Sequence, residues 1–286
     1  MYPPKFDYYR ASSVAEAVSL LGAHPGAKVL AGGHSLIPAM NLRLADPGVL
    51  IDIGRIDELR GISALPGGGF RIGALTTHAM VAGASELPAV LTEAASMIGD
   101  PQVRNRGTVG GNVSHADPAS DLPTVFMALG ATFHITGPGG SRSVAATDFF
   151  VDLFTTALQD GEILTAIEVP ALPAHTGSGY AKLFNPASRY AMVSAAAVVT
   201  VSGNRCEAVS VAVGGLTPKA TKAVSVEAAL VGKQLDEETV AAAATAVSGD
   251  LGDDILGDIH ASAEYRRRMA PVFVKRALLK AIERAK

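Results

Sequence analysis

One stretch organises this chain: Arg104-Asn-Arg-Gly-Thr-Val-Gly-Gly-Asn-Val-Ser-His-Ala-Asp-Pro-Ala-Ser-Asp-Leu-Pro123. It concentrates glycines, hydroxyl and amide side chains and two carboxylates, and the apolar run 124–129 follows it at once. Glycines at 107, 110 and 111 allow positive φ and a close approach of the backbone to a ligand. Successive main-chain N–H groups in such a turn can surround an anion without any basic side chain. The stretch therefore predicts a loop that binds a diphosphate.

A second glycine loop, Ala31-Gly-Gly-His-Ser35, lies between a β-type run and the start of a helix. Free N–H groups and the positive end of a helix dipole meet at such a junction, which suits phosphate. Taken alone, the pentapeptide is better explained as a tight strand-to-helix turn with Ser35 as an ordinary N-cap. Two glycine loops that each open a helix favour a clamp on one diphosphate.

Composition limits the classes of function. The chain has 286 residues, with 48% hydrophobic and 18% charged, which suits two or three domains with a sizeable core. Its net charge of −3 argues against a nucleic-acid-binding protein. The single cysteine excludes internal disulfides and an iron–sulfur cluster held by this chain alone. No signal peptide and no run of about 18 apolar residues is visible, so we expect a cytoplasmic chain without a membrane span.

The order of apolar and turn segments predicts three units. Residues 1–55 read as an extended arm followed by a helix, a strand, the glycine turn, a helix and a strand, which is a small α/β unit. Residues 56–175 form a second such unit that contains the organising loop. Residues 176–286 change to long strands and then alanine-rich helices, an α+β pattern, and Pro271 predicts the start of a second helix within 263–285.

Several common motifs are absent from the sequence. There is no Gly-x-Gly-x-x-Gly after a strand, no P-loop, no His-Glu-x-x-His and no Cys-x-x-Cys, so we predict no metal ligands in this chain. A stand-alone oxidoreductase that uses NAD or a sugar nucleotide, and a non-catalytic interaction protein, both remain open at this point.

Two long motifs resemble the flavin-binding signatures of a known family. Ala31-Gly-Gly-His-Ser-Leu-Ile-Pro-x-Met-x-Leu-Arg-Leu44 and the run from Arg104 through Asn112 to Asp121 are similar to those of the medium subunit of molybdenum hydroxylases. This is the FAD subunit of the xanthine dehydrogenase and carbon monoxide dehydrogenase family, and the carbon monoxide dehydrogenase type is the most similar. The likeness continues through 52–59, 161–167, 215–219 and the Tyr265-Arg-Arg segment, so it covers essentially the whole chain.

The resemblance implies a vanillyl-alcohol-oxidase/PCMH-type FAD-binding fold in the α+β class. Two α/β subdomains, 1–55 and 56–175, would hold the cofactor, and 176–286 would form the C-terminal α+β domain.

The resemblance also implies the cofactor site, with no catalytic residue and no metal. Lys182 would reach the pyrimidine end of the flavin ring, Leu164 (or its neighbour Ile163) would lie beside the ring, and Tyr190 would cover one face. Arg189 departs from common family versions, which leaves the surroundings of the ring open. The full set of implied FAD-binding residues is Ala31, Gly32, Gly33, His34, Ser35, Leu36, Thr108, Gly110, Gly111, Asn112, His115, Ser120, Asp121, Leu164, Lys182 and Tyr190.

The implied function is electron transfer within a complex. A large subunit would carry the molybdenum cofactor, a small subunit would carry two [2Fe-2S] clusters, and two heterotrimers would pair as (LMS)2. The chain described here would bind FAD non-covalently and pass electrons to an external acceptor. The resemblance implies that the large subunit determines the substrate of such a complex.

Overall fold

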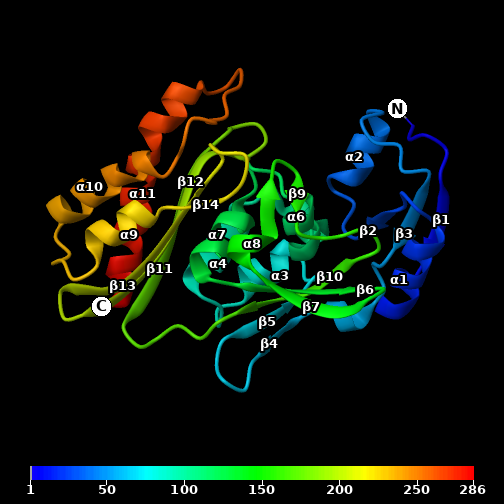
Figure 1. The fold of residues 1–286 in the computed structure, drawn as a ribbon, viewed down its shortest axis with the longest axis horizontal. Coiled ribbons are helices and arrows are strands. Elements are labelled where there is room, and N and C mark those ends of the chain that lie inside the picture. The colour runs from blue at the N-terminus through cyan, green and yellow to red at the C-terminus, as the bar shows by residue number, and fades with distance from the viewer. Residues whose placement is uncertain (1) are drawn as a thin grey trace.

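The computed structural model describes residues 2–286. Three main sheets and their helices follow one another along the molecule, with the N-terminal sheet at one end and the C-terminal sheet at the other (Figure 1). The expected α+β class is confirmed.

The N-terminal unit is a three-stranded parallel sheet in the order β1-β3-β2. Residues 7–10, expected only as part of an extended arm, pair with residues 49–52 as a full strand. Ser13 caps the first helix, because its hydroxyl accepts a hydrogen bond from Glu16 N. The elements of this unit are β1 (Asp7–Arg10), α1 (Val14–Ala23), β2 (Lys28–Leu30), α2 (Leu36–Asn41) and β3 (Val49–Asp52).

The central unit is a five-stranded antiparallel sheet with helices packed on one face. Strand order is β4-β5-β10-β6-β7, so this sheet is antiparallel throughout. Its elements are η1 (Asp57–Leu59), β4 (Ile62–Ala64), β5 (Phe70–Gly73), α3 (His78–Gly83), α4 (Ala89–Ser96), α5 (Pro101–Arg106), α6 (Val109–His115), α7 (Asp121–Leu129), β6 (Thr132–Gly137), β7 (Gly140–Ala145), α8 (Ala146–Phe149), β8 (Phe150–Asp152), β9 (Thr155–Thr156) and β10 (Ile163–Val169).

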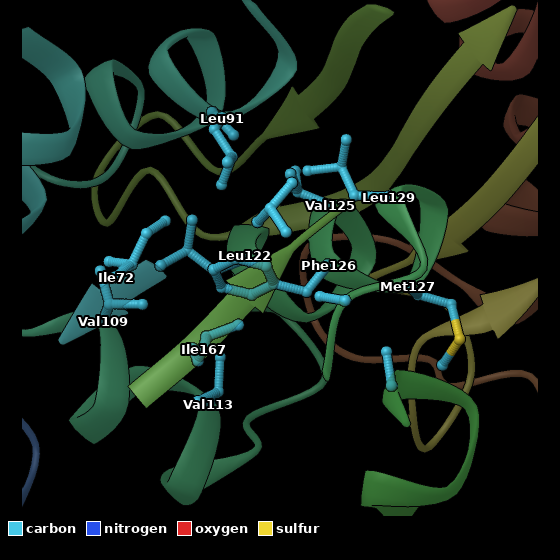
Figure 2. Close-up of a cluster of buried hydrophobic side chains, with 14 of the residues drawn as sticks. Ile72, Leu91, Val109, Val113, Leu122, Val125, Phe126, Met127, Leu129 and Ile167 are labelled. Carbon is cyan, nitrogen blue, oxygen red and sulfur yellow. The ribbon is translucent and has the colours of Figure 1, made fainter. Parts of the chain in front are cut away.

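The largest hydrophobic core lies between this sheet and its helices. Figure 2 shows Val109 beside Ile72 and Val113 beside Ile167, so α6 packs its apolar face on β5 and β10. Helix α7 is buried along its whole length, which fixes the position of the segment that precedes it.

The organising stretch is more helical than its sequence indicates. The expected loop from 104 to 123 contains the end of α5, all of α6 and the start of α7. Gly107, Gly110 and Gly111 do not appear among the positive-φ residues of the described chain, so the expected left-handed turn is wrong. The structure gives a different reason for glycine at one of these positions. A Cβ atom at Gly110 would lie 2.5 Å from Ala74 Cβ, so glycine lets α6 pack directly against the end of β5.

The C-terminal unit is a four-stranded antiparallel sheet with helices on both faces. Helix α11 covers one face, and α4 and α7 of the central unit cover the other (Figure 1). The elements are β11 (Thr176–Phe184), β12 (Ala191–Ser202), β13 (Arg205–Gly214), β14 (Thr221–Lys222), α9 (Val224–Leu230), α10 (Glu237–Thr245), η2 (Ala246–Gly249) and α11 (Ala263–Ala285).

Pro271 lies inside one continuous helix, so the predicted break is wrong. An internal proline removes a main-chain hydrogen bond and costs a helix roughly 3 kcal/mol. Ala270 and Val274 on either side of it are fully buried against the sheet. This packing compensates for the missing bond, and it is a tertiary effect that local sequence does not contain.

None of the helices within 2–286 combines the length and apolar character that a membrane crossing requires.

Candidate functional site

The first glycine loop presents several unpaired donors. Among residues 2–286, no hydrogen bond is donated by the main-chain N–H groups of Gly32, Gly33, His34 or Ser35. Ser35 occupies the N-cap position of α2, as expected, but its side chain makes no capping bond. Gly33 has φ of +75°, a conformation that favours glycine. The loop can therefore offer consecutive N–H groups to an anion.

The two glycine segments meet across a tight contact. A Cβ atom at Gly32 would overlap the carbonyl oxygen of Arg106, so only glycine allows the loop to lie this close to the end of α5. A Cβ atom at Gly111 would lie 3.9 Å from Ala31 Cβ, which places the start of α6 beside the same loop. The structure thus brings together the two segments that the sequence paired.

A cleft of about 310 Å³ opens at this contact. Ala31, Gly32 and Gly33 line it from one side, and Thr108 lines it from the other. Its lining also includes three arginines, one carboxylate and three other residues that sequence reasoning missed. These residues are Asp52, Gly54, Arg55, Arg60, Thr77, Asn105 and Arg106. One signal was available for Asp52, which ends β3, and for Arg55, which follows it, because neighbouring parallel strands end at the same edge of a sheet.

The second segment does not supply the free N–H groups expected of it. Val109 N donates to Thr76 O at 2.9 Å, Gly110 N to Ala74 O at 2.8 Å, and Gly111 N to Thr108 Oγ1 at 3.2 Å. These bonds attach the start of α6 to β5 and to its own cap. The N–H groups of 109–111 are therefore already paired, and the free donors lie in the first loop, with Thr108 facing them across the cleft. Binding of the ligand by the second segment stays a prediction.

Farther along α6, an amide has one unused acceptor. Asn112 Nδ2 donates to Ser120 Oγ at 3.2 Å, whereas Asn112 Oδ1 is buried and accepts no hydrogen bond from the described residues. A buried acceptor without a partner is rare in folded proteins and fits a ligand hydroxyl. His115, at the end of α6, packs its ring against Phe154, with centroids 5.1 Å apart.

Asp121 and Lys182 form a buried ion pair. Lys182 Nζ lies 2.8 Å from Asp121 Oδ1, and the two side chains are 1% and 5% exposed. Tyr180 OH donates to the same oxygen at 2.5 Å. Burial raises the pKa of the Asp121 carboxyl, and the Lys182 ammonium and the Tyr180 hydroxyl oppose that shift. Burial and the Asp121 charge raise the pKa of Tyr180 well above its usual value, so this phenol stays a donor.

The remaining site residues lie in different surroundings. Tyr190, directly before β12, is 44% exposed. Leu164 is buried in the central core, whereas its neighbour Ile163 packs with Ile51 and Leu75 toward the N-terminal unit. The roles assigned to these side chains stay predictions.

Comparison with known proteins identifies the family. Residues 4–172 match the model described as the FAD binding domain in molybdopterin dehydrogenase, and residues 178–281 match the CO dehydrogenase flavoprotein C-terminal domain. The chain belongs to this family of FAD-binding subunits. The resemblance found in the sequence, and the FAD-binding fold that it implied, are confirmed.

Similar proteins match this chain over nearly its full length. The carbon monoxide dehydrogenase medium chain of Hydrogenophaga pseudoflava is 42% identical over 97% of each chain. The glyceraldehyde dehydrogenase medium chain of Sulfolobus acidocaldarius is 40% identical over 97% of this chain and 98% of that one. The solved carbon monoxide dehydrogenase of H. pseudoflava superimposes with a TM-score of 0.94 over 99% of each chain. The chain is thus similar to oxidoreductase subunits, and it carries an FAD-binding domain.

The residues of the FAD-binding domain fit the chemistry of FAD. Four unpaired N–H groups and three arginines surround a cleft that suits a diphosphate, and Asn112 Oδ1 can accept from a hydroxyl. No group of three or more His, Cys, Asp or Glu side chains in the described part of this subunit is arranged to hold a metal ion.

One histidine of the FAD-binding domain should make stability depend on pH. His78 is 3% exposed, and burial, followed by the charges of His34 and Arg104, lowers its pKa to about 4 from a usual 6.5. Its contribution is therefore complete above pH 6.5 and is lost as pH falls toward 4. Between pH 7.5 and 5 we expect a loss of about 2 kcal/mol in unfolding free energy from this group.

Urea unfolding of the wild type and of His78→Leu at both pH values measures this loss. The variant should lack that part of the pH dependence, and His260→Gln, at an exposed position, should retain it. Equal pH dependence in His78→Leu and the wild type would contradict the assignment.

Proposed function

We propose that this chain is the FAD-binding electron-transfer subunit of a heterotrimeric molybdenum hydroxylase. The observation that carries the proposal is the cleft in which the unpaired N–H groups of the first glycine loop face Thr108 and three arginines. When bound, FAD would supply the ability to accept electrons one at a time and to pass two of them to an external acceptor.

The protein's own residues would bind and orient this cofactor. The N–H groups of residues 32–35, with Arg55 and Arg106, would hold the diphosphate by charge-assisted hydrogen bonds. Thr108, Asn112 and Ser120 would bond the ribityl and ribose hydroxyls. The remaining members of the proposed FAD-binding set are Ala31, Leu36, Gly110, Gly111, His115, Asp121, Leu164, Lys182 and Tyr190. We infer non-covalent attachment for the whole set.

The proposed partners follow from what this chain lacks and from the names of its relatives. One cysteine is too few to ligate an iron–sulfur cluster. The similar chains are medium chains, a name that implies a larger and a smaller companion. We therefore place the molybdenum cofactor in a large subunit and the [2Fe-2S] clusters in a small one, assembled as (LMS)2.

Titration of the purified chain with FAD tests the proposal. We expect a yellow protein with the two flavin absorption bands, and FAD at 100 times its Kd should raise the unfolding free energy by about 2.7 kcal/mol. NAD and a UDP-sugar serve as matched diphosphate controls that should give no such shift. A colourless protein that is stabilised by NAD or the UDP-sugar but not by FAD would overturn the proposal.

The assembly is tested separately. The chain, purified from its own cells, should co-elute with a molybdenum-containing chain and an iron–sulfur chain, which mass spectrometry and metal analysis identify. A chain that elutes alone with full FAD would contradict the heterotrimer.

A further inference from the structure

One buried guanidinium lies outside the proposed FAD-binding set. Arg266, on α11, is 4% exposed and belongs to the Tyr265-Arg-Arg segment. A buried charge is costly unless it is paired and hydrogen-bonded, so its partners indicate its role. Asp258, in the loop before α11, supplies the counter-charge through an ion pair with Nη2, and Nε donates to Ala261 O at 3.3 Å. The remaining partners, bonded by Nη1, belong to the C-terminal sheet.

Those partners lie where the pairing of two strands ends. Ser194 and Gly214 are the last paired residues at this end of β12 and β13. Just beyond them, Arg266 Nη1 donates to Met192 O at 3.2 Å and also to Gly215 O. A guanidinium carries its donors in a rigid planar fork, so it can hold two carbonyl groups at a set spacing. Arg266 therefore connects these strands where their main-chain pairing stops.

The same two strand ends hold the turn that leads into Ser120. Gly215 N donates to Pro118 O at 2.9 Å, and Ala191 N donates to Ala119 O at 3.0 Å. Ser120 is the next residue of the chain and belongs to the proposed FAD-binding set. Two main-chain donors of the C-terminal unit thus fix the turn that presents it.

Gly215 is the residue through which the guanidinium reaches this turn. It bonds the turn through its N–H and Arg266 through its C=O. Its φ is +82°, and a Cβ atom there would lie 2.6 Å from Ala191 O, so glycine is needed both for the conformation and for the close approach of β12. The junction is therefore tightly packed, and a shift of either strand end moves the donors of the turn.

We propose that Arg266 is a positioning residue of the FAD site, whose guanidinium fixes Met192 and Gly215 and through them the turn of residues 117–120. The inference rests on the proposed function only for the contact between Ser120 and FAD. Without the guanidinium, two carbonyl groups lose their donor, and the ends of β12 and β13 are no longer held together. The turn then loses its two fixed donors, and Ser120 moves with it.

Amide hydrogen exchange in the FAD-free chain tests the link directly. In Arg266→Met we expect the amides of Ala191 and Gly215 to exchange about tenfold faster than in the wild type, because local opening at the junction exposes them. Leu278→Ala is the matched control, since it removes fully buried packing from the same helix and should affect these two amides no more than the rest of the sheet. If Arg266→Met does not fold, Arg266→Lys keeps the charge without the fork and should give the same local effect. Exchange that is unchanged in a folded Arg266 variant, or raised evenly over the sheet as in the control, would overturn the proposal.

FAD affinity separates positioning from general stability. Arg266→Met should weaken FAD binding by about tenfold, because the loss of a charged donor at the junction displaces a contact residue of the cofactor. Leu278→Ala, which destabilises the same helix without touching the junction, should bind FAD as the wild type does. Wild-type affinity in the Arg266 variant, or an equal loss in Leu278→Ala, would contradict the positioning role. A wild-type chain that binds no FAD would refute the proposed function, and the exchange experiment would then decide whether Arg266 holds the turn.

Discussion

Gly32→Val should reduce FAD affinity by about 100-fold, equivalent to about 2.7 kcal/mol. A Cβ atom at this position would overlap the main-chain oxygen of Arg106, which the end of α5 holds in place. The loop would have to move away from the segment that faces it, and the cleft between them would open. Overpacking of this kind also destabilises a fold by about 1–3 kcal/mol, so affinity and unfolding free energy are measured together, by calorimetric titration and by urea.

Gly22→Ala provides the matched control for this variant. Gly22 lies inside α1, and a Cβ atom there would meet nothing within 4 Å. We expect unchanged FAD affinity and a gain of about 0.5–1 kcal/mol in unfolding free energy, because alanine suits a helix interior better than glycine. Gly32→Val with the affinity of the wild type would show that the contact between loop and helix end does not shape the FAD site.

Gly32 and Gly110 illustrate how much of the site could be predicted. From the two glycine motifs we predicted that both segments bind one ligand. The structure does bring the two segments together. The reason assigned to Gly110, positive φ, is wrong, whereas Gly33, for which the sequence analysis gave no such reason, does have a positive φ. Glycine at 32 and 110 is needed because another backbone lies where a side chain would be, and such a neighbour is far away in sequence.

The arginines of the cleft show where sequence reasoning stops. Arg60 and Arg106 come from segments on either side of the cleft, and no local pattern marks them as neighbours, whereas the parallel strand order offered a signal for Arg55. Helix α6 itself was not predicted, for a related reason. Two adjacent glycines argue against a helix in isolation, but Val109 and Val113 are buried beneath them in the central core, and that packing stabilises the helix.

The buried strands were predicted better, because they are continuous apolar runs in the sequence. Ala191–Val201 and Ile163–Val169 read as apolar strands, and both are strands in the structure, buried in the interior. Residues 7–10 are exposed throughout, so their pairing with β3 has no hydrophobic signal. Pattern reasoning thus finds strands that build a core and misses those that only extend a sheet.

Asp121→Ala should cost about 3–5 kcal/mol of unfolding free energy, because it leaves the Lys182 ammonium buried without its partner. That ammonium is 1% exposed, and the Tyr180 hydroxyl would lose its acceptor as well. Sequence alone gives a different expectation, a loss of FAD with the fold intact, since an acidic residue beside a glycine motif suggests a ligand contact. The structure indicates that a fall in FAD occupancy in this variant would arise largely from a weakened fold. Urea unfolding of the FAD-free chain measures the stability term without any contribution from the cofactor.

The double variant Asp121→Ala/Lys182→Met separates the two causes. It removes the unpaired charge, so we expect it to recover at least half of the stability lost in Asp121→Ala, because apolar groups often replace a buried ion pair at little cost. If FAD affinity returns together with stability, the Asp121 carboxylate is a structural partner of Lys182 and not a cofactor ligand. If stability returns while FAD affinity stays low, the side chains of the pair contact the cofactor themselves, the carboxylate through Oδ2, the oxygen that neither Lys182 nor Tyr180 uses; the affinity of Lys182→Met alone then separates the two contributions. A double variant as unstable as Asp121→Ala would contradict the account of the buried pair, because no uncompensated charge would then remain to explain the loss.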